Sequence, residues 1–591
     1  MWSIIQDLEE FNMAGTVAEL AYMFGELSDD TGTSVGYMWD KWSRNRQGWM
    51  EEKKELRNYV FQTDTRTTGV ASWKNSTSMP KICQIRDNLH SNYISAIFPN
   101  DNWLKWEAYD SAASSKDVRE QITAYMRHKM TQSDLRTEVS KLIYDYIDFG
   151  NCFAEPEWDY GMAGMDKNGH AHQSYVGPRL ARISPMDIVF NPLAPDFESA
   201  PRIVRYVKTI GELTLLARTD EMWAEALAKT LEMRAGAGSY SVDDYHKALG
   251  FQVDGFGDMK EYYDTEYVEI LRFLGDFYDK EAGTVEIAKE IIVIDRSFTV
   301  SVRDIPSPVG SGNVSHAGWR LRPDNLYAMG PLDNLVGMQY RIDHLQNLKA
   351  DAMDLLVHPP LAVQGDVEAF VWEPEAVISI IGEGSVTELT KSAQGVGVAD
   401  NEITMLEARM EEYAGAPKEA MGVRTPGEKT LGEVNQLANA AGRIFQEKVI
   451  NFELFLEKLL KGLLAEACIH EGGTEVPLMD ADLGFVDFTM ITNSSLIQNG
   501  TLRPVGARHF GQTAKLVTDL TTVLNGPMGQ MIMPHLSGKA AAAMITDVFE
   551  LGRYDLMRPN VAVHEQAETQ SVMNATQETN MVEQGTPGVA E

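Results

Sequence analysis

Apolar residues recur at every third or fourth position over several stretches of the chain, which is the spacing of helices that bury one face. This pattern predicts helices over residues 80–97, 401–414 and 430–470, and two further helices within 115–149. Helices with one apolar face must pack against other elements, so these segments belong to a folded protein. The longest of them has a continuous apolar stripe made of Phe452, Phe455, Leu456, Leu459, Leu460, Leu463 and Leu464.

The stretch 266–302 has a different pattern and is rich in Val, Ile, Thr, Phe and Tyr. The polar run Asp279–Gly283 inside it is typical of a hairpin turn, so about forty residues here should form a small β-rich module. Together the two patterns predict an α+β fold that is mainly helical. Shorter strands are expected near 152–158, 179–183 and 203–208, and again within 361–381.

Residues 326–357 have the longest unbroken helical pattern in the middle of the chain. Pro331 near its start is tolerated in the first turn of a helix, and Pro359 ends it. Such a helix would be about 48 Å long and would need a partner surface along one apolar seam. We expect Leu335, Ile342 and Leu345 to pack there. The whole seam consists of Leu332, Leu335, Met338, Ile342, Leu345, Leu348, Ala352 and Leu355.

Residues 382–400 are predicted to form a flexible loop. Four glycines make the backbone permissive, and one basic residue, Lys391, stands among several acidic ones. The acidic residues are Glu383, Glu388 and Asp400.

The length of 591 residues is sufficient for roughly three to five domain-sized units, and 44% hydrophobic residues suffice for packed cores. The first residues lack the basic stretch of a secretory signal, and no apolar run is long enough to span a membrane. Cys83, Cys152 and Cys468 are too far apart for a zinc site or a disulfide framework. We expect them to be buried thiols in a reducing compartment.

The net charge is strongly negative, with 52 basic against 86 acidic residues, which gives −34. Proteins that grip duplex DNA neutralise its phosphates with Lys and Arg, so this chain should not hold DNA tightly over a large face. Ordinary solubility is a sufficient explanation for the charge. The charge is also compatible with a conduit through which DNA slides.

Motifs for catalysis or cofactor binding fail on inspection. The run Gly422–Thr430 resembles a phosphate-binding loop, but Glu428 occupies the position of the essential lysine. Asp343, Asp351 and Asp354 with His344 fit a solvated helix face better than a metal site, because no paired-histidine spacing accompanies them. We therefore expect no catalytic, cofactor-binding or metal-binding residues and no enzymatic activity.

Several motifs in a fixed order resemble the head-to-tail connector (portal, collar) proteins of short-tailed, podovirus-type phages. Trp73-Lys-Asn-Ser, Met79-Pro-Lys and Phe98-Pro lie in the N-terminal part, Tyr327-Ala-Met-Gly330-Pro lies in the middle, and Arg424-Thr-Pro-Gly427-Glu-Lys-Thr430 precedes the long helix. Ala328-Met329 and Pro426 depart from the usual pattern of the family. The likeness covers most of residues 40–560.

The resemblance implies a non-enzymatic ring, with twelve subunits in the family plan, at one vertex of the virion capsid. Double-stranded DNA would pass through its channel during packaging and ejection. The implied partners are the large subunit of the terminase motor, the major capsid and scaffolding proteins and a tail adaptor, with assembly in the bacterial cytoplasm and without a membrane. The plan assigns an N-terminal arm and wing to 1–208, a helical region with the first stem helix to 209–261, a β-rich clip to 262–322, the second stem helix to 323–358, further wing to 359–480, a helical crown to 481–560 and an acidic flexible tail to 561–591.

In this plan the loop 382–400 becomes the tunnel loop, and we hypothesise that it contacts DNA. The contacts would come from its backbone and from Ser385, Thr387, Thr390 and Lys391. Phosphate contacts of this kind are independent of DNA sequence. The alternatives are an ordinary surface loop, another head-tail adaptor or helical scaffold protein of a virion, and a metal- or nucleotide-dependent enzyme acting on nucleic acid.

Overall fold

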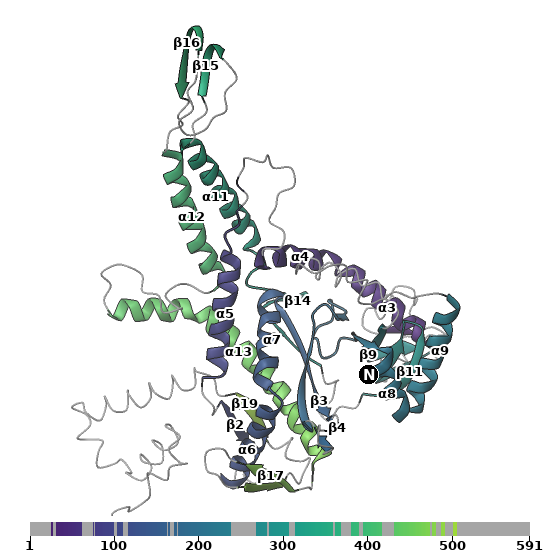
Figure 1. Cartoon of the computed structure of the whole chain (residues 1–591). Coiled ribbons are helices and arrows are strands. Elements are labelled where there is room, and N and C mark those ends of the chain that lie inside the picture. Colours follow the sequence, from purple (N-terminus) through teal and green to yellow (C-terminus); the bar gives the residue numbers. More distant parts are fainter. Residues whose placement is uncertain are drawn as a thin grey trace, which may run out of the picture. The chain divides into compact units, whose positions relative to one another are not determined.

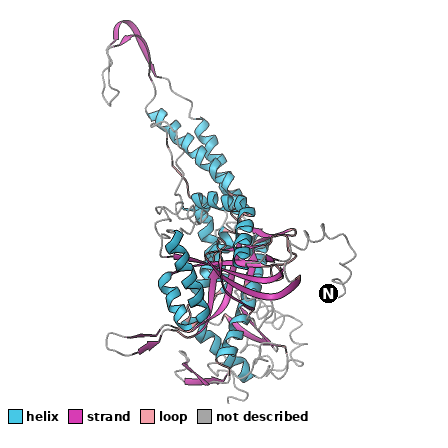
Figure 2. Ribbon diagram, turned by 90° about the vertical axis from the view of Figure 1, so that its right-hand side faces the viewer, coloured by secondary structure: helices cyan, strands magenta, loops and turns pink. Residues whose placement is uncertain are grey.

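The chain forms two compact units, residues 1–97 with 104–504 and residues 98–103 with 505–591, and every helix and strand named below belongs to the first. That unit has an α+β fold, about half helical, with several small sheets that are almost entirely antiparallel (Figures 1 and 2). The computed structural model describes residues 25–27, 31–61, 75, 77–99, 103–109, 116–161, 163–165, 171–173, 175–237, 267–279, 283–305, 314–357, 361–367, 380–388, 394–415, 431–472, 475–479, 486–490 and 500–504.

The helices of the N-terminal part confirm the predictions made from the apolar spacing. The predicted helix 80–97 is α5, and the five positions of its apolar stripe, Ile82, Ile85, Leu89, Tyr93 and Ile97, are all buried. The two helices expected within 115–149 are present as well. The bounds are α3 Thr31–Asn45, α4 Gln47–Phe61, α5 Lys81–Ile97, α6 Lys116–Gln132 and α7 Leu135–Asp148.

The largest sheet has the strand order β11-β10-β9-β8-β7, and β1 is added in parallel at the far end of β9. The predicted hairpin is confirmed, since β9 and β10 pair antiparallel across the expected turn. The β-rich character of this stretch is confirmed by β9, β10 and β11, and the sheet extends beyond it, because β9 also pairs with β8 from Tyr267 to Leu274. The strands are β1 Gly25–Leu27, β7 Ile188–Phe190, β8 Arg202–Thr209, β9 Tyr267–Asp279, β10 Thr284–Ile294 and β11 Phe298–Asp304.

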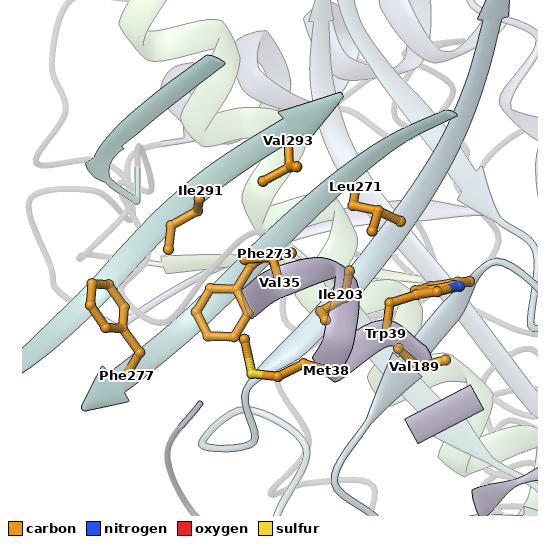
Figure 3. Close-up of a cluster of buried hydrophobic side chains, with 10 residues drawn as sticks. All are labelled: Val35, Met38, Trp39, Val189, Ile203, Leu271, Phe273, Phe277, Ile291 and Val293. Carbon is orange, nitrogen blue, oxygen red and sulfur yellow. The ribbon is translucent and has the colours of Figure 1, made fainter. Parts of the chain in front are cut away.

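Both faces of this sheet are covered. On one face α3 packs through Val35, Met38 and Trp39 against buried side chains of β7 to β10 (Figure 3). Gly32 and Gly36 allow this close approach, because a Cβ at either position would meet the backbone of Ser297 or Arg296.

On the other face lie α8 Ile210–Thr219 and α9 Glu221–Ala237, where Leu213, Ala226 and Leu227 pack against Val268 and Ile270. The region in which the first stem helix was expected therefore supplies two helices that cover a sheet.

Several buried charges of this unit form ion pairs. Arg272 on β9 contacts Glu155 at 2.7 Å and Glu290 at 2.5 Å, and Arg303 also reaches Glu290. Tyr206 donates a 2.6 Å hydrogen bond to Glu155. Two carboxylates beside it raise the pKa of the Arg272 guanidinium against the effect of burial.

Asn151 joins three strands at the start of β3, Asn151–Asp159. Its Nδ2 donates to the carbonyls of Phe149 and Ala328, and its Oδ1 accepts from the Ala328 N–H and from Nε2 of His316 at 2.9 Å. His316 stacks on Phe153 with ring centroids 4.8 Å apart. Burial, together with the charge of Lys458, lowers the pKa of His316 to about 3, so this ring is neutral in the folded chain.

The long C-terminal helix α13, Leu431–His470, confirms the prediction for 430–470, and all seven residues of its apolar stripe are buried. It packs closely on β3, where Gly462 faces Pro156 at a distance that leaves no room for a Cβ. The smaller sheets contain β2 Leu104–Ala108, β3 Asn151–Asp159, β4 Ala163–Met165, β5 Ala171–Gln173, β6 Gly177–Ile183, β12 Ser315–Gly318, β13 Arg320–Arg322, β14 Asn325–Met329, β17 Glu475–Met479, β18 Val486–Met490 and β19 Gly500–Pro504.

Candidate functional site: the paired-helix arm

The candidate site is a pair of neighbouring helices, α11 Val336–Val357 and α12 Gln394–Tyr413, which we call the arm. Beyond their ends lies a two-stranded hairpin of β15 Leu361–Val367 and β16 Ile380–Glu388 (Figures 1 and 2). Two ion pairs link the helices, Arg341 with Glu402 at 3.0 Å and Lys349 with Asp400 at 2.5 Å.

The arm corrects the helix predicted for 326–357. Its first residues form β14, which pairs with β13, and α11 begins only at Val336. Pro331 follows Gly330, whose N–H donates a 2.8 Å hydrogen bond to Asp333, and the resulting turn separates strand from helix. The helix is therefore about 33 Å long rather than 48 Å.

The arm also corrects the flexible loop predicted for 382–400. Residues 380–388 form β16, and α12 already begins at Gln394. The Ile, Val and Thr residues at the start of this stretch favour a strand, and β15 supplies its partner. Gly395 and Gly397 lie in the first turns of α12, where a Cβ would meet no other atom within 4 Å.

The residues proposed for DNA contact are divided by this arrangement. Ser385 and Thr387 are exposed on β16, opposite Gln364 and Ala362 of β15. Thr390 and Lys391 lie outside the described residues. The structure thus does not bring the four residues together in one loop.

The three residues proposed for helix packing are buried within the single chain. Leu335 lies just before α11 and Ile342 and Leu345 lie on it, with exposed fractions of 0%, 0% and 6%. Leu348 of the same predicted seam is 49% exposed. The apolar seam is therefore covered at the base of α11, exposed at Leu348 and half-buried at Ala352 and Leu355.

Four polar residues on one face of α11 bind a short segment that precedes α5. We call Asp343, Asn347, Asp351 and Asp354 the ladder, and residues 75 and 77–79 the strap. Met79 and Thr77 donate backbone N–H groups to Asp343 at 2.8 Å and Asn347 at 2.7 Å. Asn75 donates its backbone N–H to Asp351 at 2.7 Å and its Nδ2 to Asp354 at 2.7 Å. Burial raises the pKa of the Asp343 carboxyl.

The prediction of a purely solvated face for these carboxylates is therefore wrong. Sequence spacing shows that Asp343, Asp351 and Asp354 share a helix face, but their acceptor groups are used by a segment more than 260 residues away in the chain. Within the described part of the chain, no group of three or more His, Cys, Asp or Glu residues is placed to hold a metal ion.

The start of α5 holds both helices of the arm. Gln339, buried on α11, accepts a 3.2 Å hydrogen bond from the Ile82 N–H and donates to the Met79 carbonyl. Lys81 forms a 2.7 Å ion pair with Glu411 of α12. The strap and the first turn of α5 thus connect α11 and α12 to α5.

Much of the arm's apolar surface is left uncovered. A third of the large exposed hydrophobic side chains in the described residues lie on these two helices. On α12 the spacing of seven and eight residues places Val398, Met405 and Tyr413 in one stripe. The remaining members of this set, on α11, are Tyr340, Leu348, Met353 and Val357.

The exposed residues of α11 lie on two different faces. Successive residues of a helix are about 100° apart around its axis. The mean direction of Tyr340 and Leu348 therefore differs by about 160° from the mean direction of Met353 and Val357. The ladder and the side toward α12 occupy the directions in between. The arm therefore offers apolar side chains on two nearly opposite sides.

The charge of the arm is predominantly acidic. On α12 five acidic residues stand against one basic residue, and on α11 three stand against two. The described strands β15 and β16 add three acidic residues and no basic one. A surface of this composition repels phosphate groups.

Other possible sites give weaker support for a function. A cavity of about 370 Å³ is lined by Arg182, Asp187 and Arg205, but these charges already form ion pairs with carboxylate or guanidinium groups of the chain. Cys152 and Cys468 are buried as predicted, whereas Cys83 is partly exposed. The run Gly422–Thr430 lies outside the described residues.

None of the helices described by the structure combines the length and the apolar character needed to cross a lipid bilayer. Comparison of the sequence with models of known protein families, and with curated proteins, yields no match to either.

Proposed function

We propose that this chain is a portal protein, the subunit of a ring at a capsid vertex through which double-stranded DNA is packaged and ejected. The observation that carries the proposal is the arm, a pair of long helices with a β-hairpin at its end and apolar side chains on opposite sides. A closed ring requires each subunit to present two different surfaces, one to each neighbour. The two apolar faces of α11 and the stripe on α12 meet that requirement.

The order of elements supports a revised plan for the subunit. In the resemblance, a clip lies between two stem helices, and a tunnel loop connects the second stem helix to a long core helix. The sequence α11, β15–β16, α12 and α13 has this order. We therefore assign α11 and α12 to the stem and the hairpin to the clip, and β7 to β11 with α13 to the wing.

This plan moves the tunnel loop. It no longer falls at 382–400, and Ser385 and Thr387 become clip residues. The acidic arm suits a channel wall that DNA passes without adhering, because phosphate contacts depend on Lys and Arg. The terminase, capsid, scaffolding and tail-adaptor partners remain expectations from the resemblance.

The test is imaging of the purified full-length chain by negative-stain electron microscopy, together with its mass distribution in solution. We expect rings with a central hole. Met405→Asp places a charge in the α12 stripe and should reduce the fraction of chains in rings, because a buried unpaired charge is costly. Leu215→Asp on α8 is the matched control, since Leu215 is also exposed but lies outside the arm.

Compact monomers at all concentrations would contradict the proposal and favour a different class of protein. Rings that form equally well from the Met405→Asp chain would retain the portal function but remove α12 from the contact between subunits.

A further inference from the structure

We infer that the strap and the first turn of α5 act as a detachable clamp that fixes both helices of the arm to α5. This inference concerns the single chain and does not depend on whether the chain forms a ring.

The first argument is the kind of contact. The strap is held on α11 almost entirely by hydrogen bonds from N–H groups to the side chains of the ladder, at 2.7 to 3.0 Å. Three of the four ladder residues are carboxylates, and hydrogen bonds to a charged acceptor are stronger than neutral ones. Contacts that are polar and partly exposed can open without exposing a hydrophobic core.

The second argument is that the contacts are spread along the helix. Asp343, Asn347, Asp351 and Asp354 follow one another at intervals of three or four residues, so the ladder covers three turns of α11. The strap runs in the opposite direction, with Met79 at Asp343 and Asn75 at Asp351. Such a contact resists bending of α11 more than a single contact at its base would.

The third argument is that the clamp holds both arm helices. Gln339 of α11 accepts a hydrogen bond from Ile82 of α5, and Lys81 of α5 forms an ion pair with Glu411 of α12. A movement of α5 would therefore be transmitted to α11 and α12 together. The outer part of the arm, beyond the buried Ile342 and Leu345, has no comparable apolar anchor among the described residues.

The experiment compares hydrogen exchange in the full chain and in a variant carrying Asp351→Ala and Asp354→Ala. Alanine removes the acceptors for Asn75 and at the same time favours the helical conformation, so faster exchange cannot be attributed to a weaker α11 helix. We expect exchange at residues 75–79 to become at least about tenfold faster, as for the loss of hydrogen bonds to charged groups. A smaller increase should appear at the outer turns of α11, while peptides from β8 and β9 should keep their rates.

Glu412→Ala on α12 is the control, because it removes an exposed carboxylate of the arm that makes no contact with the strap in the structure. Asp343→Ala is a second variant at the other end of the ladder and should accelerate exchange at Met79. The inference is overturned if both ladder variants leave exchange at 75–79 unchanged. It is equally overturned if β8 and β9 accelerate as much as the strap, since the ladder would then stabilise the whole fold rather than hold the arm.

Discussion

Leu345 and Leu348 lie one turn apart on α11, yet their environments differ. Substitutions at the two positions therefore test folding and assembly separately. Leu345 is 6% exposed in the single chain and Leu348 is 49% exposed. Replacing Leu345 with Asp removes a buried side chain worth about 2 kcal/mol and adds a buried, unpaired carboxylate that costs several kcal/mol more. The total, about 4 kcal/mol or more, is a large part of the stability of a typical domain.

Leu348→Asp should behave differently. A substitution at an exposed position usually changes the free energy of unfolding by less than about 0.5 kcal/mol, so the single chain should fold as before. In a ring that covers this face, each contact between subunits would lose about 2 kcal/mol or more of binding free energy. Ring formation should then require a protein concentration at least about tenfold higher.

The assay combines chemical unfolding of the monomeric fraction with the mass distribution over a range of concentrations. We expect Leu345→Asp to lower the unfolding midpoint, and Leu348→Asp to shift only the ring-to-monomer ratio. Equal loss of stability in both variants would refute the assignment of burial along α11. Normal ring formation by Leu348→Asp would show that this face does not touch a neighbour.

Three further outcomes are expected. Arg272→Met should lower the free energy of unfolding by about 3 to 5 kcal/mol, because Glu155 stays buried without its cation while Glu290 keeps only Arg303; urea unfolding measures it, and a change under 1 kcal/mol, within the scatter of ordinary substitutions, would oppose the reasoning. The folded-state pKa of His316 is depressed below its unfolded value, so stability should fall as pH drops below about 6.5 toward 3, by up to about 1.4 kcal/mol per pH unit, and His316→Asn should remove this part of the slope. An unchanged slope would argue against a neutral buried ring. The purified chain should also show no ATP turnover above background, and turnover abolished by Lys429→Ala would contradict the non-enzymatic proposal.

Local patterns in the sequence predict elements well where a single rule applies. The apolar stripes of α5 and α13 and the turn between β9 and β10 are set by residues close together in the chain, and all three are confirmed. The α+β class follows from the presence of both patterns. The sequence does not predict the start of α11, because residues 325–329 fit a helical period equally well, and the choice of strand depends on pairing with β13.

Contacts between distant segments could not be predicted in this way. The alternating pattern of β9 shows that its faces are buried, but it does not reveal that β8 is its neighbour. The ladder was recognised as one face of a helix, whereas the strap that binds it carries ordinary turn residues such as Asn75 and Ser78 with no distinctive spacing. The stripe Val398, Met405 and Tyr413 was detectable from its spacing, but the glycines near its start favoured a loop.

The arm also shows why an apolar period does not identify the partner. The spacing along α11 predicts a single apolar seam, but the chain itself covers Ile342 and Leu345 and leaves Leu348 exposed. An apolar period indicates that one face of a helix is buried. The period is the same whether the covering surface belongs to the same chain or to another one. Only the folded chain separates the two cases, because whatever apolar surface remains after folding is available for assembly. On α11 and α12 that remainder is large and lies on more than one side, which is the arrangement a ring of identical subunits requires.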